Sequence, residues 1–272
     1  METANEGVAI MLYICGTPIG NIKDITLRCI DTLKSVDIIL AEDTRNTIKL
    51  LNHYDIKNKL VAYHKYNEKS ALNKILSWLQ EGKNIALVTD AGMPCISDPG
   101  GELVKLCQDN DIPYTSVPSA TALTTAVSLA GIDTPYTFLG FLPTKQKEMK
   151  ELLEKQTGTF VFYEAPHRLN KTLTKIKDIL GDCEAIICRE LTKKFEEIKT
   201  GKLSEVIEYF NEPKGEFVCI VHTCKKKAHM YDIASIAQKY LAEGFSKKET
   251  IKIVAIQTGL PRNEIYSKVM QM

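Results

Sequence analysis

Several signals that would place this sequence in a familiar class are missing from it. The loop after the first apolar run, "GTPIGNIKDIT" (16–26), has neither the GxGxxG pattern of a dinucleotide-binding turn nor the GK[ST] ending of a P-loop. No apolar run reaches the roughly 20 residues that span a bilayer. These absences exclude a P-loop NTPase and a GxGxxG enzyme, and they predict a protein that does not enter a membrane.

Cysteine is present, but not in the spacing of a redox or metal site. The eight cysteines include no CxxC pair and lie mostly inside apolar runs, and the sequence has no His, Cys, Asp or Glu cluster with metal-ligand spacing. The "CIVHTC" run (219–224) alternates like a strand, so we interpret its cysteines as core residues. Glu2 and Glu6 stand where an export signal would carry positive charge. We therefore expect a cytoplasmic protein with reduced, buried cysteines and no metal.

Short apolar runs alternate with helical patterns through most of the chain. Strands are predicted at 8–15, 36–43, 59–64, 84–90, 113–117, 136–142, 158–164, 184–190, 196–201 and 215–224. Helices are predicted at 24–35, 45–54, 67–82, 101–110, 119–130, 145–156, 167–180 and 203–211. The alternation within residues 8–117 favours a mainly parallel sheet with helices on both faces. Because a second series of strands and helices begins near Pro118, we predict two α/β domains that meet near 115–120. Their predicted bounds are 1–117 and 118–226, and a helical extension follows at 227–272.

The C-terminal segment differs in charge from the rest of the chain. Residues 225–272 contain nine Lys/Arg and four Asp/Glu, a net +5, which leaves −4 for residues 1–224 because the whole chain is +1. Gly244 and "TGLP" (258–261) divide this segment into three short helical stretches, and the last two resemble a helix-turn-helix. Its predicted apolar face consists of Ile251, Val254, Ala255, Ile265 and Val269. The charge indicates either an anionic partner or a solvated helical surface.

Polar loops follow the apolar runs and hold the chemically informative residues. Six of them are "GTPIGNIKD" (16–24), "AEDTR" (41–45), "DAGMPCISDPG" (90–100), "PSATA" (118–122), "YEAPHR" (163–168) and "RELTKKFEE" (189–197). Because ligands bind outside the carboxyl ends of strands in open α/β sheets, we expect these loops to converge on one cleft between the domains. The third loop contains glycines, prolines and acids but no Lys or Arg, so it does not suit a phosphate.

Arginine is scarce, and its placement is uneven. The chain has 30 lysines and five arginines, and Arg45, Arg168 and Arg189 lie in the loops quoted above. Where lysine is the default cation, an arginine indicates a site that needs a planar, bidentate donor. We interpret these arginines as functional or domain-interface residues, with chance clustering or a buried ion pair as the alternatives.

Taken in order, the six loops resemble those of one known family. They are similar to the loops of the ribosomal RNA small-subunit methyltransferase I family, which belongs to the tetrapyrrole-methylase-like (class III) S-adenosylmethionine enzymes. The resemblance extends from about Leu12 to Thr223. It implies two α/β domains with a cofactor cleft between them, a homodimer, and 16S rRNA or the small ribosomal subunit as partner. The implied reaction is methyl transfer to the ribose 2′-hydroxyl of a cytidine in the decoding region of 16S rRNA.

The resemblance also implies which residues hold S-adenosylmethionine. This cofactor carries a sulfonium cation and a flat base, which a stiff loop rimmed by carboxylates suits better than an arginine cradle would. The implied cofactor-binding residues are Pro18, Asp90, Ala91, Gly92, Pro94, Ile96, Ser97, Ser119, Ala120 and Thr121, with Tyr163, Glu164, Ala165 and Pro166 on the far side.

The reaction needs alignment and a group that handles the proton of the hydroxyl. The candidates for a base or an anion-stabilising group are Glu190, Glu196, Lys193, Arg189, Asp43 and Asp98, and the sequence does not choose among them. For the catalytic set we select Arg189, Glu190, Lys193, Asp43 and Arg45. We favour Arg189 as the group that orients the ribose or a phosphate, and we expect Glu190 to hold Arg45, Arg168 or Lys193 in place. A purely structural Glu190–arginine pair is the alternative.

Two other functions stay open at this point. One is a class III methyltransferase that acts on a tetrapyrrole or on a protein side chain, for which the basic C-terminal segment would have no role. The other is a non-catalytic RNA-binding protein on the same fold. Cofactor binding would distinguish this second alternative from an enzyme.

Overall fold

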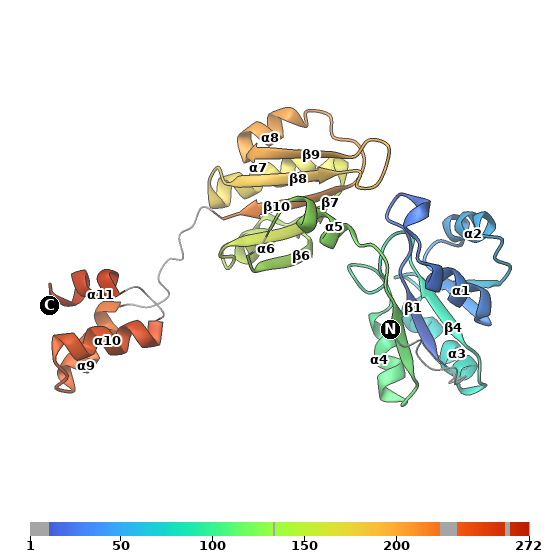
Figure 1. Cartoon of the computed structure of the whole chain (residues 1–272), viewed down its shortest axis with the longest axis horizontal. Helices are drawn as coiled ribbons and strands as arrows, with labels where there is room; N and C mark the ends of the chain where they lie inside the picture. The colour runs from blue at the N-terminus through green and yellow to red at the C-terminus, as the bar shows by residue number, and fades with distance from the viewer. Residues whose placement is uncertain (1–10, 133, 224–232, 259–261, 272) are drawn as a thin grey trace. The chain divides into compact units, whose positions relative to one another are not determined.

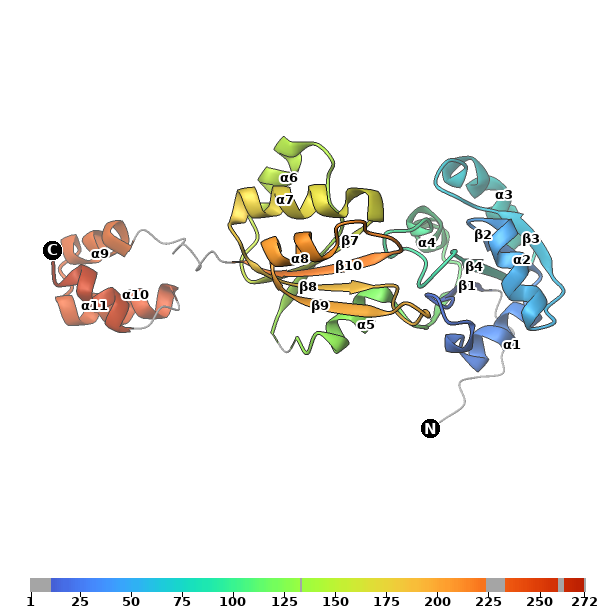
Figure 2. The ribbon, with the colours of Figure 1, turned by 90° about the horizontal axis from the view of Figure 1, so that it is seen from above.

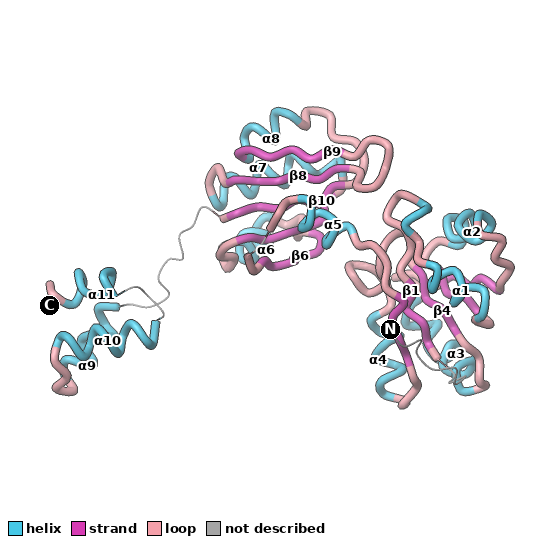
Figure 3. The backbone as a smooth tube through the Cα atoms, in the orientation of Figure 1, coloured by secondary structure: helices cyan, strands magenta, loops and turns pink. Residues whose placement is uncertain are grey.

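The computed structural model describes residues 11–132, 134–223, 233–258 and 262–271. The chain divides into two compact units, Met1–Cys224 and Lys225–Met272. The first unit contains two five-stranded sheets, and the second contains three helices (Figures 1 and 3). The predicted division of the first unit at residues 117 and 118 falls after the last strand of the first sheet.

The first sheet is parallel throughout. Its strands are β1 (Leu12–Cys15), β2 (Ile38–Ala41), β3 (Lys59–Ala62), β4 (Ile85–Val88) and β5 (Tyr114–Val117). They lie in the order β3-β2-β4-β1-β5, and each neighbouring pair is parallel. The connecting helices are η1 (Ile22–Asp24), α1 (Leu27–Ser35), α2 (Thr44–His53), α3 (Glu68–Gln80) and α4 (Gly101–Asp109). The predicted parallel sheet is confirmed.

Alternating side chains of the buried strands fill two separate cores. In β2, Ile39 and Ala41 pack with α1 and α2, whereas Ile38 and Leu40 pack with α3 and α4. Successive strand residues point to opposite faces, so an uninterrupted apolar run indicates a strand covered on both sides. Because β2 and β4 are apolar at every position, the sheet takes up the middle layer between two helical layers. The carboxyl ends of its strands are left open to receive a ligand.

The second sheet is mixed. Its strands are β6 (Tyr136–Phe141), β7 (Thr159–Glu164), β8 (Glu184–Arg189), β9 (Glu197–Lys202) and β10 (Phe217–His222). In the order β6-β7-β10-β8-β9, only the β6–β7 pair is parallel. Its helices are α5 (Ala122–Leu129), α6 (Gln146–Leu153), η2 (Pro166–Arg168), α7 (Leu169–Leu180) and α8 (Leu203–Tyr209). The β8–β9 connection has no helix, so these two strands pair as an antiparallel hairpin.

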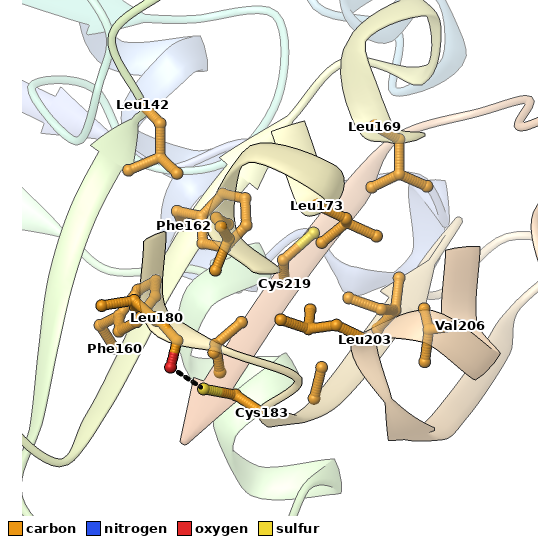
Figure 4. Close-up of a cluster of buried hydrophobic side chains, with 14 of the residues drawn as sticks. Leu142, Phe160, Phe162, Leu169, Leu173, Leu180, Cys183, Leu203, Val206 and Cys219 are labelled. Atoms are coloured by element: carbon orange, nitrogen blue, oxygen red, sulfur yellow. Dashed lines mark hydrogen bonds between the residues drawn. The ribbon is translucent and has the colours of Figure 1, made fainter. Parts of the chain in front are cut away.

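Helices cover both faces of the second sheet. Helices α6, α7 and α8 lie on one face, and α5 lies on the other (Figure 2). Figure 4 shows the larger core, in which Leu173 of α7 meets Phe162 of β7 and Cys219 of β10, all fully buried. The opposite core also contains a residue from a loop of the first sheet. Ile19, in the loop after β1, is buried among α5, β7 and β10 residues.

The C-terminal unit is a small three-helix cluster. Its helices are α9 (Ile233–Ala242), α10 (Lys247–Thr258) and α11 (Arg262–Val269). The predicted apolar face is confirmed, because Ile251, Val254, Ile265 and Val269 are buried together and Ala255 packs against them. The described lysines and arginine of this unit, namely Lys239, Lys247, Lys248, Lys252, Arg262 and Lys268, are all exposed. Tail residues 224–232, which include Cys224 of the "CIVHTC" run, lie outside the described residues.

Two helices begin later than their periodicity predicts, because a threonine caps each of them. The Thr26 hydroxyl accepts a hydrogen bond from the Cys29 N–H (3.1 Å), so α1 begins at residue 27 rather than 24. The Thr121 hydroxyl accepts one from the Thr124 N–H (3.2 Å) and delays α5 to residue 122. Residues 118–121 therefore stay in an extended loop at the end of β5. The part of the predicted first strand at 8–10 lies outside the described residues.

The described residues include no helix that is both long and apolar enough to cross a membrane.

We predict that Leu173→Ala lowers the free energy of unfolding by about 2–5 kcal/mol, because it leaves a cavity in the core shown in Figure 4. Urea denaturation followed by circular dichroism measures the change. Lys171→Ala, an exposed position on the same helix, is the control and should change stability by less than about 0.5 kcal/mol. Equal effects of the two substitutions would contradict the packing described.

Candidate functional site

A cavity of about 480 Å³ lies where strand ends of the two sheets meet. The first sheet contributes the loops after β1, β2 and β4, and the second contributes the ends of β6 and β7, the loop after β8 and the start of β10. The lining residues are Ile19, Glu42, Asp90, Ala91, Gly92, Met93, Ile96, Ser97, Asp98, Thr121, Ala122, Phe141, Tyr163, Glu164, Ala165, Pro166, Leu191, Glu216, Phe217 and Val218. Its size is that of a small-molecule site.

The loop after β4 forms one wall of the cavity and is held by its own backbone. Gly92 and Thr17 exchange two backbone hydrogen bonds (2.9 and 3.1 Å), which ties this loop to the one after β1. Cys95 and Ser97 both have left-handed backbones, with φ of 69° and 68°. Left-handed conformations of non-glycine residues cost about 1–3 kcal/mol each and persist where the surrounding structure fixes them. Two such residues within three positions indicate that the surrounding structure holds this loop in a fixed conformation, as is common at functional sites.

The opposite wall is shaped by an irregularity in β6. The pairing of β6 with β7 shifts between Phe138 and Phe141, and Gly140 lies in the shift with φ of 61°. A Cβ atom at Gly140 would lie 3.2 Å from the Ser97 hydroxyl, so this strand approaches the β4 loop closely. Phe141 and Tyr163 then stack edge to face at the cavity wall, with ring centroids 5.7 Å apart. The two sheets therefore shape the cavity together.

Glu164 is a buried carboxylate whose oxygens are fully used inside the protein. It receives the Thr172 hydroxyl (2.6 Å) and the Ala165 N–H (2.9 Å), and its ion pair with Arg168 measures 3.2 Å. Arg168 also donates to the carbonyl of Leu142 (2.8 Å). These bonds fix the turn between β7 and α7, so the cavity wall at residues 163–166 is rigid. Glu164 acts here as a positioning residue for its neighbours.

The cavity is acidic. Five carboxylates line it, and no lysine or arginine among the described residues does so. Burial, with Glu42 and Asp90 nearby, raises the pKa of Asp98 to about 7. Burial also raises the pKa of Glu42, although a hydrogen bond from the Asp90 backbone opposes this rise. Such a lining suits a ligand that carries positive charge or donates protons.

A second, more open cavity of about 430 Å³ adjoins the first. The two share Ile19, Asp90, Ala91 and Glu216. The remaining lining residues are Thr17, Pro18, Gly20, Ile22, Asn46, Lys49, Leu50 and Lys193. Both acidic and basic side chains line this cavity, namely Asp90 and Glu216 with Lys49 and Lys193. The amide of Asn46 donates to Asp90 (3.0 Å). This polar region gives a large ligand access to the acidic cavity.

The loop after β8 closes one side of the second cavity. Lys193 donates to Glu190 (2.9 Å) and to Glu216 (2.7 Å), so it ties this loop to the start of β10. The Thr192 hydroxyl accepts from the Asn21 N–H (3.0 Å) across the two sheets. A side chain at Gly20 would overlap Lys193, which leaves room for no residue larger than glycine there. Burial would raise the pKa of Glu190, but the hydrogen bonds from Lys193 and from the Glu216 N–H, together with the charges of Lys193 and Arg189, outweigh it and the pKa is lowered.

Most of the residues implied as cofactor-binding lie at these cavities. Asp90, Ala91, Gly92, Ile96, Ser97, Thr121, Tyr163, Glu164, Ala165 and Pro166 line the first cavity, and Pro18 lines the second. Pro94, Ser119 and Ala120 are not among the lining residues of either cavity in the described structure. Pro94 is buried within its loop. The hydroxyl of Ser119 is buried and has no hydrogen-bond partner among the described residues.

The catalytic candidates are less centrally placed. Lys193 lines the second cavity, whereas Arg189, Glu190, Asp43 and Arg45 line neither cavity as the structure describes them. Asp43 is the N-terminal cap of α2 and accepts from the Arg45 N–H (2.8 Å). The Arg45 side chain also donates to it, which lowers the pKa of Asp43 to about 2 and makes it a poor proton acceptor. The catalytic roles of these residues stay predictions.

The arginines mostly hold the fold together. Arg28 donates to the Ser116 carbonyl, Arg168 to Glu164 and Leu142, and Arg189 to the Lys214 carbonyl (2.7 Å) and Glu197 (3.1 Å). The buried ion pair that we considered as the alternative therefore describes Arg168 best. Arg45 differs, because its side chain is 87% exposed and pairs only with the nearby Asp43 among the described residues.

Sequence reasoning missed the part of the cavity formed by Glu216, Phe217 and Val218. It looked for site residues after strands, but β10 runs antiparallel to β7 and β8, so the beginning of β10 lies at the cavity. The "KGEF" turn (214–217) before an apolar run was the available signal. Ile19 and Leu191 lie in quoted loops, but nothing in their spacing marks them as lining residues.

This fold and cavity define a class of protein. The family model of Tetrapyrrole (Corrin/Porphyrin) Methylases matches residues 11–207. A uroporphyrin-III C-methyltransferase from Thermus thermophilus, solved with S-adenyl homocysteine, superimposes with a TM-score of 0.57 at 16% identity, over 78% of this chain and 96% of that chain. A diphthine synthase superimposes with a TM-score of 0.59 at 12% identity, over 78% and 89% of the two chains. The chain has the tetrapyrrole methylase fold.

Relatives with higher sequence identity show which family within this class the chain belongs to. The ribosomal RNA small subunit methyltransferase I of Bacillus subtilis (strain 168) is 45% identical over 94% of this chain and 92% of its own length. That of Synechocystis sp. (strain ATCC 27184 / PCC 6803 / Kazusa) is 39% identical over 96% and 98%. The chain belongs to the ribosomal RNA small subunit methyltransferase I family.

We predict that Glu164 and Arg168 are energetically coupled. Arg168→Met leaves a buried carboxylate without its charged partner and should lower the free energy of unfolding by about 1–3 kcal/mol. Adding Glu164→Gln should recover part of that loss, and urea denaturation of the two single variants and the double variant measures the coupling. Lys171→Met, an exposed position on α7, is the control. Strictly additive losses would show that the pair does not stabilise the turn.

Proposed function

We propose that this protein transfers a methyl group from S-adenosylmethionine to the RNA of the small ribosomal subunit. Its acceptor is the ribose 2′-hydroxyl of a cytidine in the decoding region of 16S rRNA. The observation that carries the proposal is the acidic cavity between two sheets of the tetrapyrrole methylase fold, in a chain 45% identical to a ribosomal RNA small subunit methyltransferase I. A homodimer is part of the proposal, and analytical ultracentrifugation tests it.

The residues of the first cavity fit S-adenosylmethionine. Glu42, Asp90 and Asp98, which form no ion pair among the described residues, suit its positive charges. The apolar surface for its adenine is offered by Ile19, Leu191, Phe217 and Val218. The buried hydroxyl of Ser119, which lacks a partner among the described residues, is a polar group available to a ligand nearby. The loops after β4, β5 and β7 would hold the cofactor.

The protein's part in the reaction is to align, desolvate and move a proton. The bound cofactor supplies a methyl group already activated by its sulfonium centre. The rigid loops at residues 90–100 and 163–166 hold the reacting groups in line, which provides much of the acceleration of a bimolecular reaction. Apolar residues such as Leu191 and Val218 line the cavity and would keep water from the reacting groups once the cofactor is bound. A protein group near the hydroxyl then has to accept its proton, because a ribose hydroxyl is a weak acid.

Mapping of 2′-O-methylation in 16S rRNA, with and without the gene for this protein, tests the function. We expect one decoding-region cytidine to lose its 2′-O-methyl group in the deletion strain and to regain it on complementation. If the deletion strain keeps its rRNA methylation and instead loses a methyl group from a tetrapyrrole or a protein, this result would support the alternative acceptors.

We predict that Asp90→Lys weakens S-adenosylmethionine binding at least about tenfold, or about 1.4 kcal/mol, since it places a cation at a site for a cationic ligand. Calorimetry in the presence of a chelator measures the affinity. Asp109→Lys, an exposed position on α4 outside both cavities, is the charge-matched control. Wild-type affinity in a folded Asp90→Lys variant would remove this loop from the binding site.

We predict that the C-terminal unit contributes to RNA binding and not to cofactor binding. Lys247, Lys248 and Lys252 are exposed on α10, and the described residues include no acidic partner for them. Reversing all three to Glu should weaken small-subunit rRNA binding and reduce the salt slope by up to about 2, because each phosphate that a lysine neutralises contributes roughly 0.7 to that slope. Filter binding at several salt concentrations measures both.

The control for this triple variant reverses three exposed lysines of the second sheet's helices and loops. Lys147, Lys155 and Lys171 give the same change in net charge. The prediction requires a larger loss of RNA affinity from the C-terminal set and unchanged cofactor affinity in both variants. Equal losses would show a general charge effect and leave the C-terminal unit without a specific role.

A further inference from the structure

The carboxylates of the first cavity differ in what they bond to. Of the five, Glu164 and Glu216 form ion pairs with neighbouring cations. Asp90 accepts a side-chain amide hydrogen bond (3.0 Å), and Glu42 accepts the backbone N–H of Asp90. Asp98 has neither a hydrogen-bond donor nor a cation among the residues that the structure describes.

An unpartnered carboxylate in a half-buried position needs an explanation. Removing a charged group from water without a compensating bond costs free energy, and proteins normally supply a donor. The loop that presents Asp98 is itself held in a costly shape, with left-handed backbones at Cys95 and Ser97 and a Cys95 N–H to Pro99 carbonyl bond of 3.3 Å. The fold therefore keeps this carboxylate facing the cavity although no other part of the described protein satisfies it.

The groups around Asp98 are acidic or neutral, and the two carboxylates among them favour its protonated form. Its own loop contributes Asp90 and Cys95, the end of β2 contributes Glu42, and β7 contributes the hydroxyl of Tyr163. Burial is the largest cause of the raised pKa, and the two carboxylates add to it. A carboxylate in this setting binds a proton more readily than an exposed one does.

We propose that Asp98 is the proton acceptor for the methyl transfer, an inference that rests on the proposed function. As the ribose oxygen bonds to the methyl carbon, its O–H bond breaks and the proton moves to a carboxylate oxygen of Asp98. The electron pair of the carbon–sulfur bond stays on sulfur, so charge and atoms balance. The other candidates suit this role less well, because Asp43 is held ionised by Arg45 and Glu190 bonds to Lys193 outside the cavity.

The ligand-free protein gives a first test. The carboxyl of Asp98 should titrate near pH 7 by carbon NMR, in a resonance that Asp98→Asn removes. The carboxyl ionises near its unfolded value of 3.8 in the unfolded chain but only near 7 in the folded one. It therefore destabilises the folded protein increasingly from about pH 4 to pH 7 and by a constant amount above. Asp98→Asn should raise Tm more at pH 8 than at pH 4. A titration near pH 4, with no pH-dependent difference in Tm, would overturn the proposal.

Single-turnover methylation of small-subunit rRNA gives the second test. Asp98→Asn should reduce the rate at least about 100-fold, the usual contribution of a general base, while the Kd for S-adenosylmethionine changes less than threefold. The wild-type rate should rise with pH to a plateau, with its midpoint at or below 7 because the cofactor's charge favours the ionised carboxylate. The residual rate of Asp98→Asn should lack this inflection. Asp109→Asn on α4 is the control and should match the wild type.

The outcomes separate the inference from the proposed function. If the wild type forms 2′-O-methylcytidine and Asp98→Asn keeps its rate, the inference fails alone. An equal loss of rate and of cofactor affinity would also overturn it, because Asp98 would then be a counter-ion for the cofactor. If the wild type methylates a base, the proposed function fails whatever Asp98→Asn does. Should Asp98→Asn not fold, Asp98→Ala serves in the same measurements.

Discussion

The site depends on one apolar side chain that crosses between the two sheets. Ile19 belongs to the loop after β1, yet it is buried in the core of the second sheet beside Val218 and Leu191. Gly20 next to it lies too close to Lys193 for any side chain, and Asn21 donates to Thr192. These contacts hold the carboxyl ends of the first sheet against the second sheet. Without them neither cavity would have both of its walls.

The fold could be predicted from the sequence to a large extent, and the reason is physical. Strands such as β2 and β4 are apolar at every position because both faces are covered, and this separates them from the helices around them. The polar loops at strand ends also supplied most of the cavity, because parallel strands bring their carboxyl ends to one edge. The first residues of the helices were less predictable. Threonine caps at Thr26 and Thr121 begin two helices later than their periodicity indicates.

The ion-pair partners of the arginines and the neighbours of each strand in the second sheet could not be predicted from the sequence. Arg168 ends η2 and Arg189 ends β8, and neither is among the lining residues of the two cavities described. Glu164 and Glu197 take up their charges, and these partners cannot be read from spacing. Glu216, Phe217 and Val218 were missed because the antiparallel direction of β10 depends on sheet order, which periodicity does not fix. Asp98 was one of six candidates for the proton-handling group and was left out of the selected catalytic set, because its lack of a donor among the described residues cannot be read from the sequence.

The acidic lining of the first cavity has a consequence for turnover. Under the proposed function the cofactor enters with a positive sulfonium and leaves as a neutral thioether. Carboxylates such as Asp90 and Glu42 attract the first form and lose that attraction at the moment of transfer. The proton left on Asp98 removes one negative charge from the wall at the same step. Electrostatics would thus bind the reactant and release the spent cofactor, and the cavity would regain its charge when the proton returns to water.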